Sequence, residues 1–366
     1  MSGAAVMQKK REAWLDYARI FAILCVICCH AVENYYGTVV SGNERIDFVP
    51  WIVENTLFTI GRLGVPLFLA ISGTLLLNRE KDVFSFYKKS VLPLIATTEI
   101  WAILNYFFAV AVYRREFSFT GLLKQMLFLD DSPLSHMWYM PMIIGLYIFV
   151  PFLSKIFQQY GQIKYYIIPL LLVAFGSVII PTMTVFLNED VLGVHRIALK
   201  INTAFGGGVY GLYFVVGFFI GRKGLLKKIK ATYLLLAMVF CLFINTIGQY
   251  YIYQHQFYTW DDLLWYTSAP IFVMGLVLFE IFRRLGKYLK NINYPVVTNL
   301  AKSTFGIYLL HNPVRLLCSS YLPMDGLNEM LKIIILFVAS LGISIIILLP
   351  FMLKWKKAGK ILFYIK

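Results

Sequence analysis

The sequence has little charge for its length. Only 14% of its 366 residues are charged, 59% are hydrophobic, and the mean hydropathy is +0.70. Soluble domains carry roughly 25% charged residues, so this composition excludes a soluble protein. Long apolar stretches recur from Trp14 almost to the C-terminus and leave no room for a folded aqueous domain. The sequence therefore predicts a polytopic membrane protein.

Cysteine and histidine are also scarce, with five of each. The cysteines lie inside predicted membrane spans, where free cysteine is an ordinary buried small residue, so we expect no disulfide framework. The histidines are scattered and lack carboxylate partners at ligand spacing, so we expect no metal site. Internal repeats, low-complexity tracts and linkers rich in proline or serine are missing too. Residues 1–366 are therefore expected to form one domain.

Ten segments are long and apolar enough to approach the length of a bilayer span, about 20 residues. They predict an all-α bundle of about ten transmembrane helices, at residues 13–36, 51–77, 91–112, 137–154, 165–187, 204–221, 231–253, 263–282, 296–320 and 331–353. The first segment is interrupted by charges at Asp16 and Arg19, and no cleavage site of small residues follows it. We therefore expect it to remain as a span and not to be removed as a secretory signal.

Acidic residues are few, so the formal net charge is +15, from 34 Lys and Arg against 19 Asp and Glu. If the N-terminus is cytoplasmic, the inside segments hold 23 of these 34 basic residues and the outside loops hold 6. Such asymmetry over short loops is the positive-inside rule, and it predicts that both termini lie in the cytoplasm. The basic loops are expected to orient the protein and to contact anionic lipid headgroups, not nucleic acid.

The first predicted span contains four ionisable residues: Asp16, Arg19, His30 and Glu33. Arg19 and His30 are 11 residues apart, which places them on one helical face, roughly 16 Å apart. Asp16 lies three residues before Arg19, and Glu33 three residues after His30, so all four share that face. Ionisable groups at the bilayer centre cost at least a few kcal/mol each and normally face a bundle interior or a wet cavity. We expect a substrate path or an active site beside this helix.

His30 is the predicted general base, because a neutral imidazole can accept a proton from a hydroxyl near neutral pH. Glu33, one turn away, would orient the ring or stabilise the imidazolium. The alternative is a polar plug that is hydrogen-bonded to neighbouring helices. Arg62, near the middle of the second span, needs a carboxylate or phosphate partner. That partner is either a substrate or a structural ion-pair partner such as Glu33 or Glu99.

The ninth span places His311 between two cations. Lys302 precedes it by nine residues, and Arg315 follows it by one turn. A histidine flanked by cations suits a ligand that bears phosphate, although Pro313 allows a second interpretation, in which His311 only marks a helix kink. His136 begins the segment HMWYMP at the mouth of the fourth span, where it would cap a helix or line an entrance.

Four segments carry recognisable motifs. Arg19 and His30 form R-x10-H, and RLGVPLFLAISGTLLL is similar to R-x-x-V-P-x-F-F-x-x-S-G, with Leu69 where a second phenylalanine is usual. HMWYMPMIIGLYIFVPFL is similar to H-x-W-[YF]-[LM] followed by G-L-Y, and STFGIYLLHNPV resembles a late segment that ends in I-Y-L-x-H. In this order, and over residues 14–315, the segments resemble the acyltransferase 3 family of membrane O-acyltransferases.

The resemblance implies a ten-helix bundle that takes an acyl group, usually acetyl, from cytoplasmic acyl-CoA and moves it to a sugar hydroxyl at the outer face of the cell membrane. Some relatives transfer succinyl or use other acceptors. Acetyl-CoA is then a donor substrate, with no permanently bound cofactor, and the acceptor is a cell-surface or lipid-linked glycan. His30 and Glu33 are the expected catalytic residues. The residues expected to bind CoA or acceptor are Asp16, Arg19, Arg62, His136, Trp138, Lys302, His311 and Arg315.

The sequence departs from the family pattern in two ways. Some members have a paired R-x-x-R, whereas Val65 occupies the second position here and leaves Arg62 alone. Others carry a fused extracytoplasmic hydrolase-like domain, which this sequence does not include. We therefore expect transfer to occur within the bundle or through a separate extracytoplasmic partner protein. Two other classes remain open: a secondary transporter or flippase of a lipid-linked sugar or small anion, and a regulatory membrane domain that has lost the chemistry.

The expected path of the substrates follows from the chemistry of CoA, which is anionic, long and thin. It requires a cationic mouth and a deep channel. Arg19 and Lys302 lie nearer the cytoplasmic halves of their helices, and His30 lies toward the outer half. The thioester and the acceptor hydroxyl are therefore expected to approach from opposite sides and to meet inside the bundle.

Overall fold

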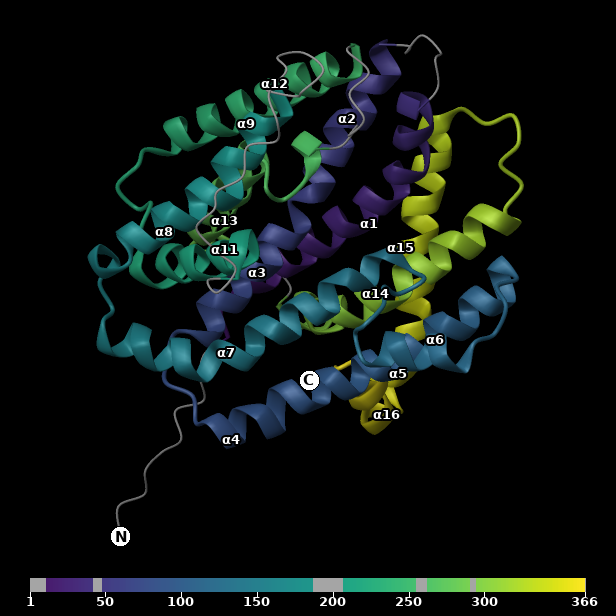
Figure 1. Cartoon of the computed structure of the whole chain (residues 1–366), viewed down its shortest axis with the longest axis horizontal. Coiled ribbons are helices and arrows are strands. Elements are labelled where there is room, and N and C mark those ends of the chain that lie inside the picture. Colours follow the sequence, from purple (N-terminus) through teal and green to yellow (C-terminus); the bar gives the residue numbers. More distant parts are fainter. Residues whose placement is uncertain (1–10, 42–47, 187–206, 255–261, 290–293, 366) are drawn as a thin grey trace.

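The structure is a computed structural model that describes residues 11–41, 48–186, 207–254, 262–289 and 294–365. Every regular element in these residues is helical, and the helices pack into one bundle (Figure 1). The all-α prediction is thereby confirmed for the described part of the chain. The long helices are α1 (Ala13–Ser41), α2 (Phe48–Arg62), α3 (Gly64–Leu76), α5 (Leu92–Tyr113), α7 (Tyr139–Gln159), α11 (Gly208–Phe218), α12 (Ala231–Gln254), α13 (Ala269–Leu285), α14 (Tyr294–Tyr321) and α15 (Glu329–Leu353).

Shorter helices connect or cap these elements. They are α4 (Val83–Phe86), α6 (Phe119–Met126), the 3-10 turn η2 (Ser135–Trp138), α8 (Ile167–Ala174), α9 (Ile180–Phe186) and α16 (Lys356–Leu362). Single π turns continue α4 into α5, α8 into α9, and α11 toward Gly224. Ser118 caps α6 by accepting a hydrogen bond from the Gly121 amide, which satisfies one of the free donors at the start of that helix.

Seven stretches of the described residues are long and apolar enough to cross a membrane. They are Ala13–Glu33, Phe48–Leu76, Val83–Tyr113, Ser135–Gln159, Ile167–Val185, Ala231–Ile252 and Glu329–Leu353. The other three predicted spans correspond to α11, α13 and α14. Helices α11 and α13 are short, with 11 and 17 residues, and α14 carries the polar residues around His311. A count of ten spans and the cytoplasmic placement of both termini therefore stay predictions.

The second span is broken into α2 and α3 at Arg62 and Leu63. Proline at position 66 has no amide hydrogen, and its ring clashes with the carbonyl four residues earlier, which is that of Arg62. The chain tightens there, since the Leu63 amide bonds back to the Ile60 carbonyl at 3.0 Å. The sequence therefore places Arg62 at a helix break inside the bundle, where its side chain is 4% exposed.

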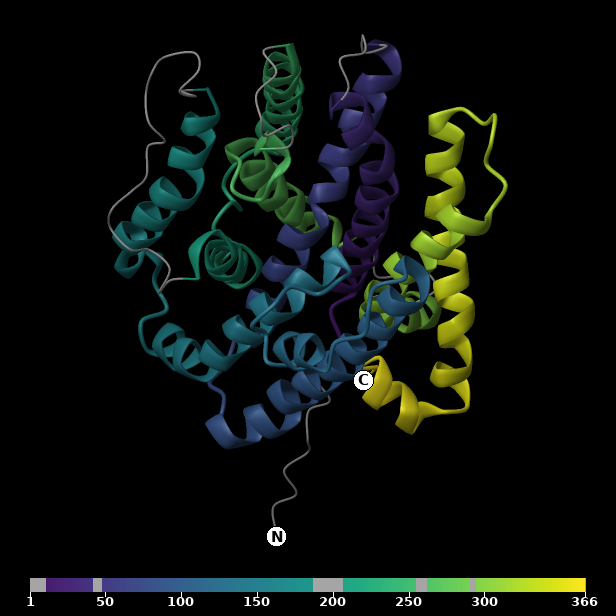
Figure 2. The same cartoon turned by 45° about the vertical axis from the view of Figure 1, so that its right-hand side comes forward.

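Helix α1 runs through the middle of the bundle and packs against α2, α3, α13, α14 and α15 (Figure 2). Its closest contacts involve glycine. A Cβ atom at Gly61 would lie 2.7 Å from the Cys29 amide nitrogen, and one at Gly64 would lie 2.6 Å from the Ala22 carbonyl oxygen. Any larger residue at these positions would push the second span away from α1, so the two glycines set the distance between the helices that carry His30 and Arg62.

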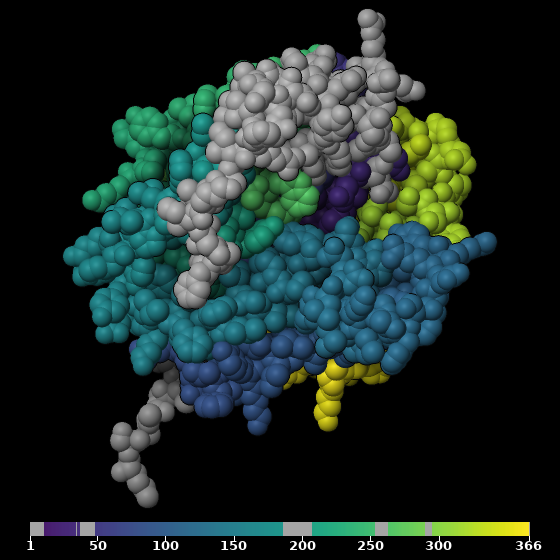
Figure 3. Space-filling view, in the orientation of Figure 1, coloured from purple at the N-terminus to yellow at the C-terminus, as the bar shows by residue number. Residues whose placement is uncertain are grey.

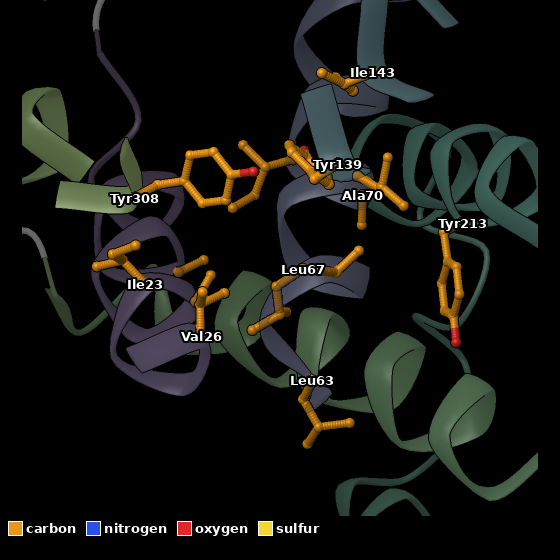
Figure 4. Packing of buried hydrophobic residues seen from close by; sticks show 14 of the residues in the cluster. Ile23, Val26, Leu63, Leu67, Ala70, Tyr139, Ile143, Tyr213 and Tyr308 are labelled. Carbon is orange, nitrogen blue, oxygen red and sulfur yellow. The ribbon is translucent and has the colours of Figure 1, made fainter. Parts of the chain in front are cut away.

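The hydrophobic core fills the space between α1, α3, α7 and α14. Figure 4 shows Ile23 and Val26 of α1 beside Leu67 of α3, with Tyr139 and Tyr308 facing each other across the bundle. The rings of these two tyrosines are 5.7 Å apart. Because Tyr139 begins α7 directly after the η2 turn that carries His136, and Tyr308 lies on α14, this contact holds η2 close to the helix that supplies His311.

Helices α4 to α7 cover the lower half of the face seen in Figure 3. The described ends of the chain lie at one end of the bundle, where α1 begins and α16 ends (Figure 2). Both ends reach the same cavity, because Arg11 and Tyr364 line it together.

The membrane topology is testable with single cysteines in a Cys-free background. Glu116→Cys, in a predicted outside loop, should react with an impermeant thiol reagent on intact cells. Lys227→Cys and Lys287→Cys, in basic inside segments, should react only after the membrane is opened. The Cys-free parent is the control for background labelling. An inverted pattern would place the basic segments outside and would contradict the predicted topology.

Candidate active site

A cavity of about 400 Å³ lies inside the bundle, bordered by α1, α2, α3, α7, α14 and the segment after α16. Ligand pockets are typically roughly 300–1,000 Å³, so the cavity has the size of a binding site. Six of the ten residues predicted to bind or react line the cavity. Arg11, which precedes α1 and was not predicted, also lines it. The predicted residues in its wall are Arg19, His30, Arg62, His136, Trp138 and Lys302.

The cavity has a cationic end and a histidine end. Arg19 and His30 on α1, and Lys302 and His311 on α14, are separated by 11 and 9 residues, which corresponds to roughly 16 and 14 Å along a helix. The rings of His30 and His311 are 5.2 Å apart, and Arg19 and Lys302 line the same cavity. The two helices therefore run in the same direction, with cations toward their starts and histidines deeper in the bundle.

Three of the five histidines meet at the deep end. His30 comes from α1, His136 from η2 and His311 from α14. Their ring centroids are 5.2 Å apart for His30 and His311, 5.2 Å for His136 and His311, and 6.4 Å for His30 and His136. No group of three or more His, Cys, Asp or Glu side chains in the described residues is arranged to hold a metal ion. The cluster is therefore considered for proton chemistry.

The tautomer of His30 is set by Glu33. Its Nδ1 lies 2.8 Å from the Glu33 Oε2, one helical turn away, as the spacing predicts. A carboxylate only accepts hydrogen bonds, so Nδ1 carries the hydrogen and Nε2 carries the lone pair. The His30 side chain is 13% exposed and lines the cavity, so a lone pair suited to accept a proton faces the ligand space.

His136 is held in the opposite tautomer. Arg315 donates from Nε to Asn312 Oδ1 at 2.9 Å, which leaves the Asn312 amide group to donate to His136 Nδ1 at 3.1 Å. With Nδ1 accepting, the ring hydrogen is on Nε2. That nitrogen is buried and has no hydrogen-bond partner among the described residues. The hydroxyl of Tyr308 also donates to the backbone carbonyl of His136 at 2.6 Å and fixes the η2 segment.

His311 lies behind the other two rings and does not line the cavity. It is fully buried, and its Nδ1 donates to the Tyr308 carbonyl at 2.6 Å. Helix α14 continues through Pro313 to Tyr321. The His311 ring thus packs against the rings of both His30 and His136. Direct contact of His311 with substrate stays a prediction.

Asp16 and Arg315 also lie behind the wall of the cavity. Asp16 is 1% exposed and accepts from Arg11 at 2.6 and 2.9 Å and from Arg19 at 3.1 Å. One carboxylate thus holds two cations at the cationic end. Arg315 acts on His136 through Asn312. Both residues are better placed to position other side chains than to touch a ligand.

Arg62 is held by aromatic rings. Its guanidinium carbon lies 4.7 Å from the Phe58 ring centroid and 4.6 Å from that of Trp265, with Tyr266 at 5.7 Å. A guanidinium stacks well on aromatic faces, and each such contact stabilises it by about 0.5–2 kcal/mol. The arginine therefore stays charged in the wall of the cavity without filling the ligand space.

Sequence analysis missed several residues of the site. Of these residues, Asn312 could have been found from the sequence, because it directly follows the candidate residue His311. Nothing in the sequence indicated Tyr364, since it comes from the C-terminal segment after α16, far along the chain from the other site residues. Its hydroxyl donates to the Ser90 carbonyl at 3.0 Å, and burial raises its pKa to about 12, so it lines the cavity as a neutral phenol.

Comparison with known families gives one match. Residues 12–349 match a family model described as an acyltransferase domain, which covers nearly the whole chain. The chain belongs to this acyltransferase family. Among curated proteins and among solved structures, no match to the chain was found. The resemblance that the motifs indicate is thereby confirmed over both histidine-bearing helices, α1 and α14.

Family membership and the apolar helices together make this protein a multi-pass membrane acyltransferase. An acyltransferase needs a base for the acceptor, a donor for the carbonyl oxygen and a place for the acyl carrier. The cavity offers a histidine lone pair at His30 and three cations, Arg11, Arg19 and Lys302, at its cationic end. His136, which carries a buried N–H, and Arg62 lie in its wall nearer the histidine end.

Proposed function

We propose that this acyltransferase moves an acyl group, most simply acetyl, from cytoplasmic acyl-CoA to a hydroxyl of a cell-surface or lipid-linked glycan. It would act in the cell membrane, in contact with membrane lipids. The donor would enter at the cationic end of the cavity and place its thioester beside the histidines. Acetyl-CoA is a substrate in this proposal, and no other cofactor is invoked.

The observation that carries the proposal is the charge of the cavity. Its described lining contains Arg11, Arg19, Arg62 and Lys302 and no carboxylate. Phosphate groups are bound by such clusters of Arg and Lys, and a low-dielectric wall strengthens the attraction. The long pantetheine arm would then extend along the apolar middle of the cavity toward His30.

The proposed chemistry is a direct transfer. The acceptor hydroxyl oxygen attacks the thioester carbonyl while His30 Nε2 takes its proton. The carbonyl oxygen becomes an oxyanion, which the His136 N–H would stabilise. The carbon–sulfur bond then breaks, the ester forms, and the CoA sulfur receives the proton from His30. Glu33 stabilises the transient imidazolium, so the products are the acylated sugar and free CoA.

Purified protein in detergent tests the function with radiolabelled acetyl-CoA and the unacetylated surface glycan taken from cells that lack the gene. We expect labelled glycan and one free CoA for each acetyl group transferred. A matched sample with His30→Ala protein measures the background. Transport of a sugar without any release of CoA would contradict the proposal and favour a flippase.

Arg19→Ala is expected to weaken CoA binding by about tenfold or more, since a charge-assisted hydrogen bond to phosphate is lost. Arg19→Lys should restore only part of the affinity, because an ammonium lacks the planar fork of a guanidinium. Titration of CoA into the purified variants measures this, with Lys124→Ala on the exposed face of α6 as the control. Unchanged affinity in Arg19→Ala would mean that Arg19 serves only as the ion-pair partner of Asp16.

A further inference from the structure

A second cavity, of about 580 Å³, adjoins the first on the far side of Trp138. It is lined by residues of α5, by Gln125 of α6 and by the loop that leads to η2. Sequence analysis places this loop, within residues 113–135, outside the cell. The residues that matter in its lining are Trp138, Trp265, Gln125, Asp130, Asp131 and Ser135.

Two tryptophans separate the cavities. Trp138 lines both, and its ring centroid is 5.5 Å from that of Tyr266, which lines the first cavity. Trp265 lines only the second, and its other side covers the guanidinium of Arg62. The distance from the second cavity to the histidine cluster is therefore short, because His136 is two residues before Trp138 in the same 3-10 turn.

The two cavities have opposite charge. The described lining of the first has four cations and no carboxylate, whereas that of the second has Asp130 and Asp131 and no Lys, Arg or His. Arg115 lines a smaller neighbouring hollow with these two residues but forms no ion pair with either among the described residues. A polyanion such as CoA is attracted to the first cavity and repelled from the second, so the second is suited to a different ligand.

Gln125 adds a buried polar group to the second cavity. Its side chain is 5% exposed, and its Nε2 donates to the Ala102 carbonyl at 3.1 Å. This bond fixes the amide and leaves Oε1 with no hydrogen-bond partner among the described residues. Oε1 is not itself buried, so it is reachable from the cavity and can accept a hydrogen bond from a ligand there. Hydroxyl groups and amines are donors of the required kind.

We propose that the second cavity binds the sugar unit that carries the acceptor hydroxyl, and that it selects neutral or amino sugars over anionic ones. Aromatic faces pack against the apolar face of a sugar ring, while carboxylate and amide oxygens accept from its hydroxyls. A uronate, sialate or phosphosugar would instead place a negative charge beside Asp130 and Asp131. The inference rests on the proposed function and specifies its acceptor.

The kinetic test uses the same unacetylated surface glycan and acetyl-CoA as separate substrates. The double variant Asp130→Asn/Asp131→Asn should raise the KM for the glycan by about tenfold, since charge-assisted hydrogen bonds are weakened. The KM for acetyl-CoA should stay within about twofold of the parent value. Glu116→Gln, a change in the same outside loop that does not line this cavity, is the control. Arg19→Ala should show the reverse pattern.

Analysis of the product provides the second test. Acetyl groups should be found on a neutral or amino sugar of the glycan, and Trp265→Ala should reduce glycan acetylation more than Trp265→Phe. Acetyl on an anionic sugar, or unchanged glycan KM in the double variant, would overturn the inference while the acyltransferase activity stands. If the parent releases no CoA from acetyl-CoA with the glycan present, both the inference and the proposed function fail.

Discussion

Replacing His30 by alanine is expected to lower the rate of acyl transfer by about 10²–10⁴-fold, the usual contribution of a positioned general base. The reason is the lone pair on Nε2, which faces the cavity because Glu33 holds the hydrogen on Nδ1 at 2.8 Å. The KM for acetyl-CoA should change little, since the cationic end is untouched. Glycan acetylation at matched expression gives the measurement.

The control for this variant is a change on the same helix away from the cavity. Cys28 lies two residues from His30, and its sulfur faces the Leu57 carbonyl at 3.8 Å. Cys28→Ala should keep nearly full activity, and both variants should elute from a size-exclusion column like the parent. His30→Ala activity within threefold of the parent would remove His30 from the mechanism.

Local features of the site follow from helical spacing alone. Asp16 and Arg19, and His30 and Glu33, are each three residues apart and each form the contact expected of such pairs, at 3.1 and 2.8 Å. The break at Arg62 follows from the proline four residues later. These contacts are predictable because both partners lie on one helix, whose geometry is the same in every protein.

The histidine cluster is not predictable in this way. His30, His136 and His311 are more than 100 residues apart in the chain, and no periodicity relates them. Their meeting depends on close packing at Gly61 and Gly64 and on the contact of Tyr139 with Tyr308. Interhelical distances are set by many side chains at once, so the sequence identified the helices but not which of their residues would touch.

The tautomer of His136 shows a further limit. The tautomer depends on Arg315 and Asn312, because Arg315 fixes the orientation of the Asn312 amide, and the amide nitrogen donates to the His136 ring. Sequence analysis assigned Arg315 to substrate binding and did not consider Asn312. A charge near a histidine suggested an anionic ligand, and binding of such a ligand by Arg315 stays a prediction; the structure adds that Arg315 bonds to Asn312.

His136→Ala is expected to reduce kcat by about 10²–10³-fold, the usual loss when one donor to an oxyanion is removed. The Nε2–H is buried, without a partner among the described residues, and belongs to a residue in the cavity wall. Because the oxyanion exists only in the transition state, KM for acetyl-CoA should stay nearly constant. Steady-state kinetics with varied acetyl-CoA separates the two constants.

A second variant keeps this test independent of folding. Asn312→Leu retains the His136 ring but removes the donor that fixes its tautomer, so kcat should fall by less than in His136→Ala, by about tenfold. The kcat of His136→Gln, which retains an N–H of similar reach, should lie between that of His136→Ala and that of the parent. Equal loss in all three variants, with lowered thermal stability, would make His136 a packing residue. A graded loss at constant stability would mean that the N–H acts on the reacting carbonyl, since packing alone does not distinguish the tautomers.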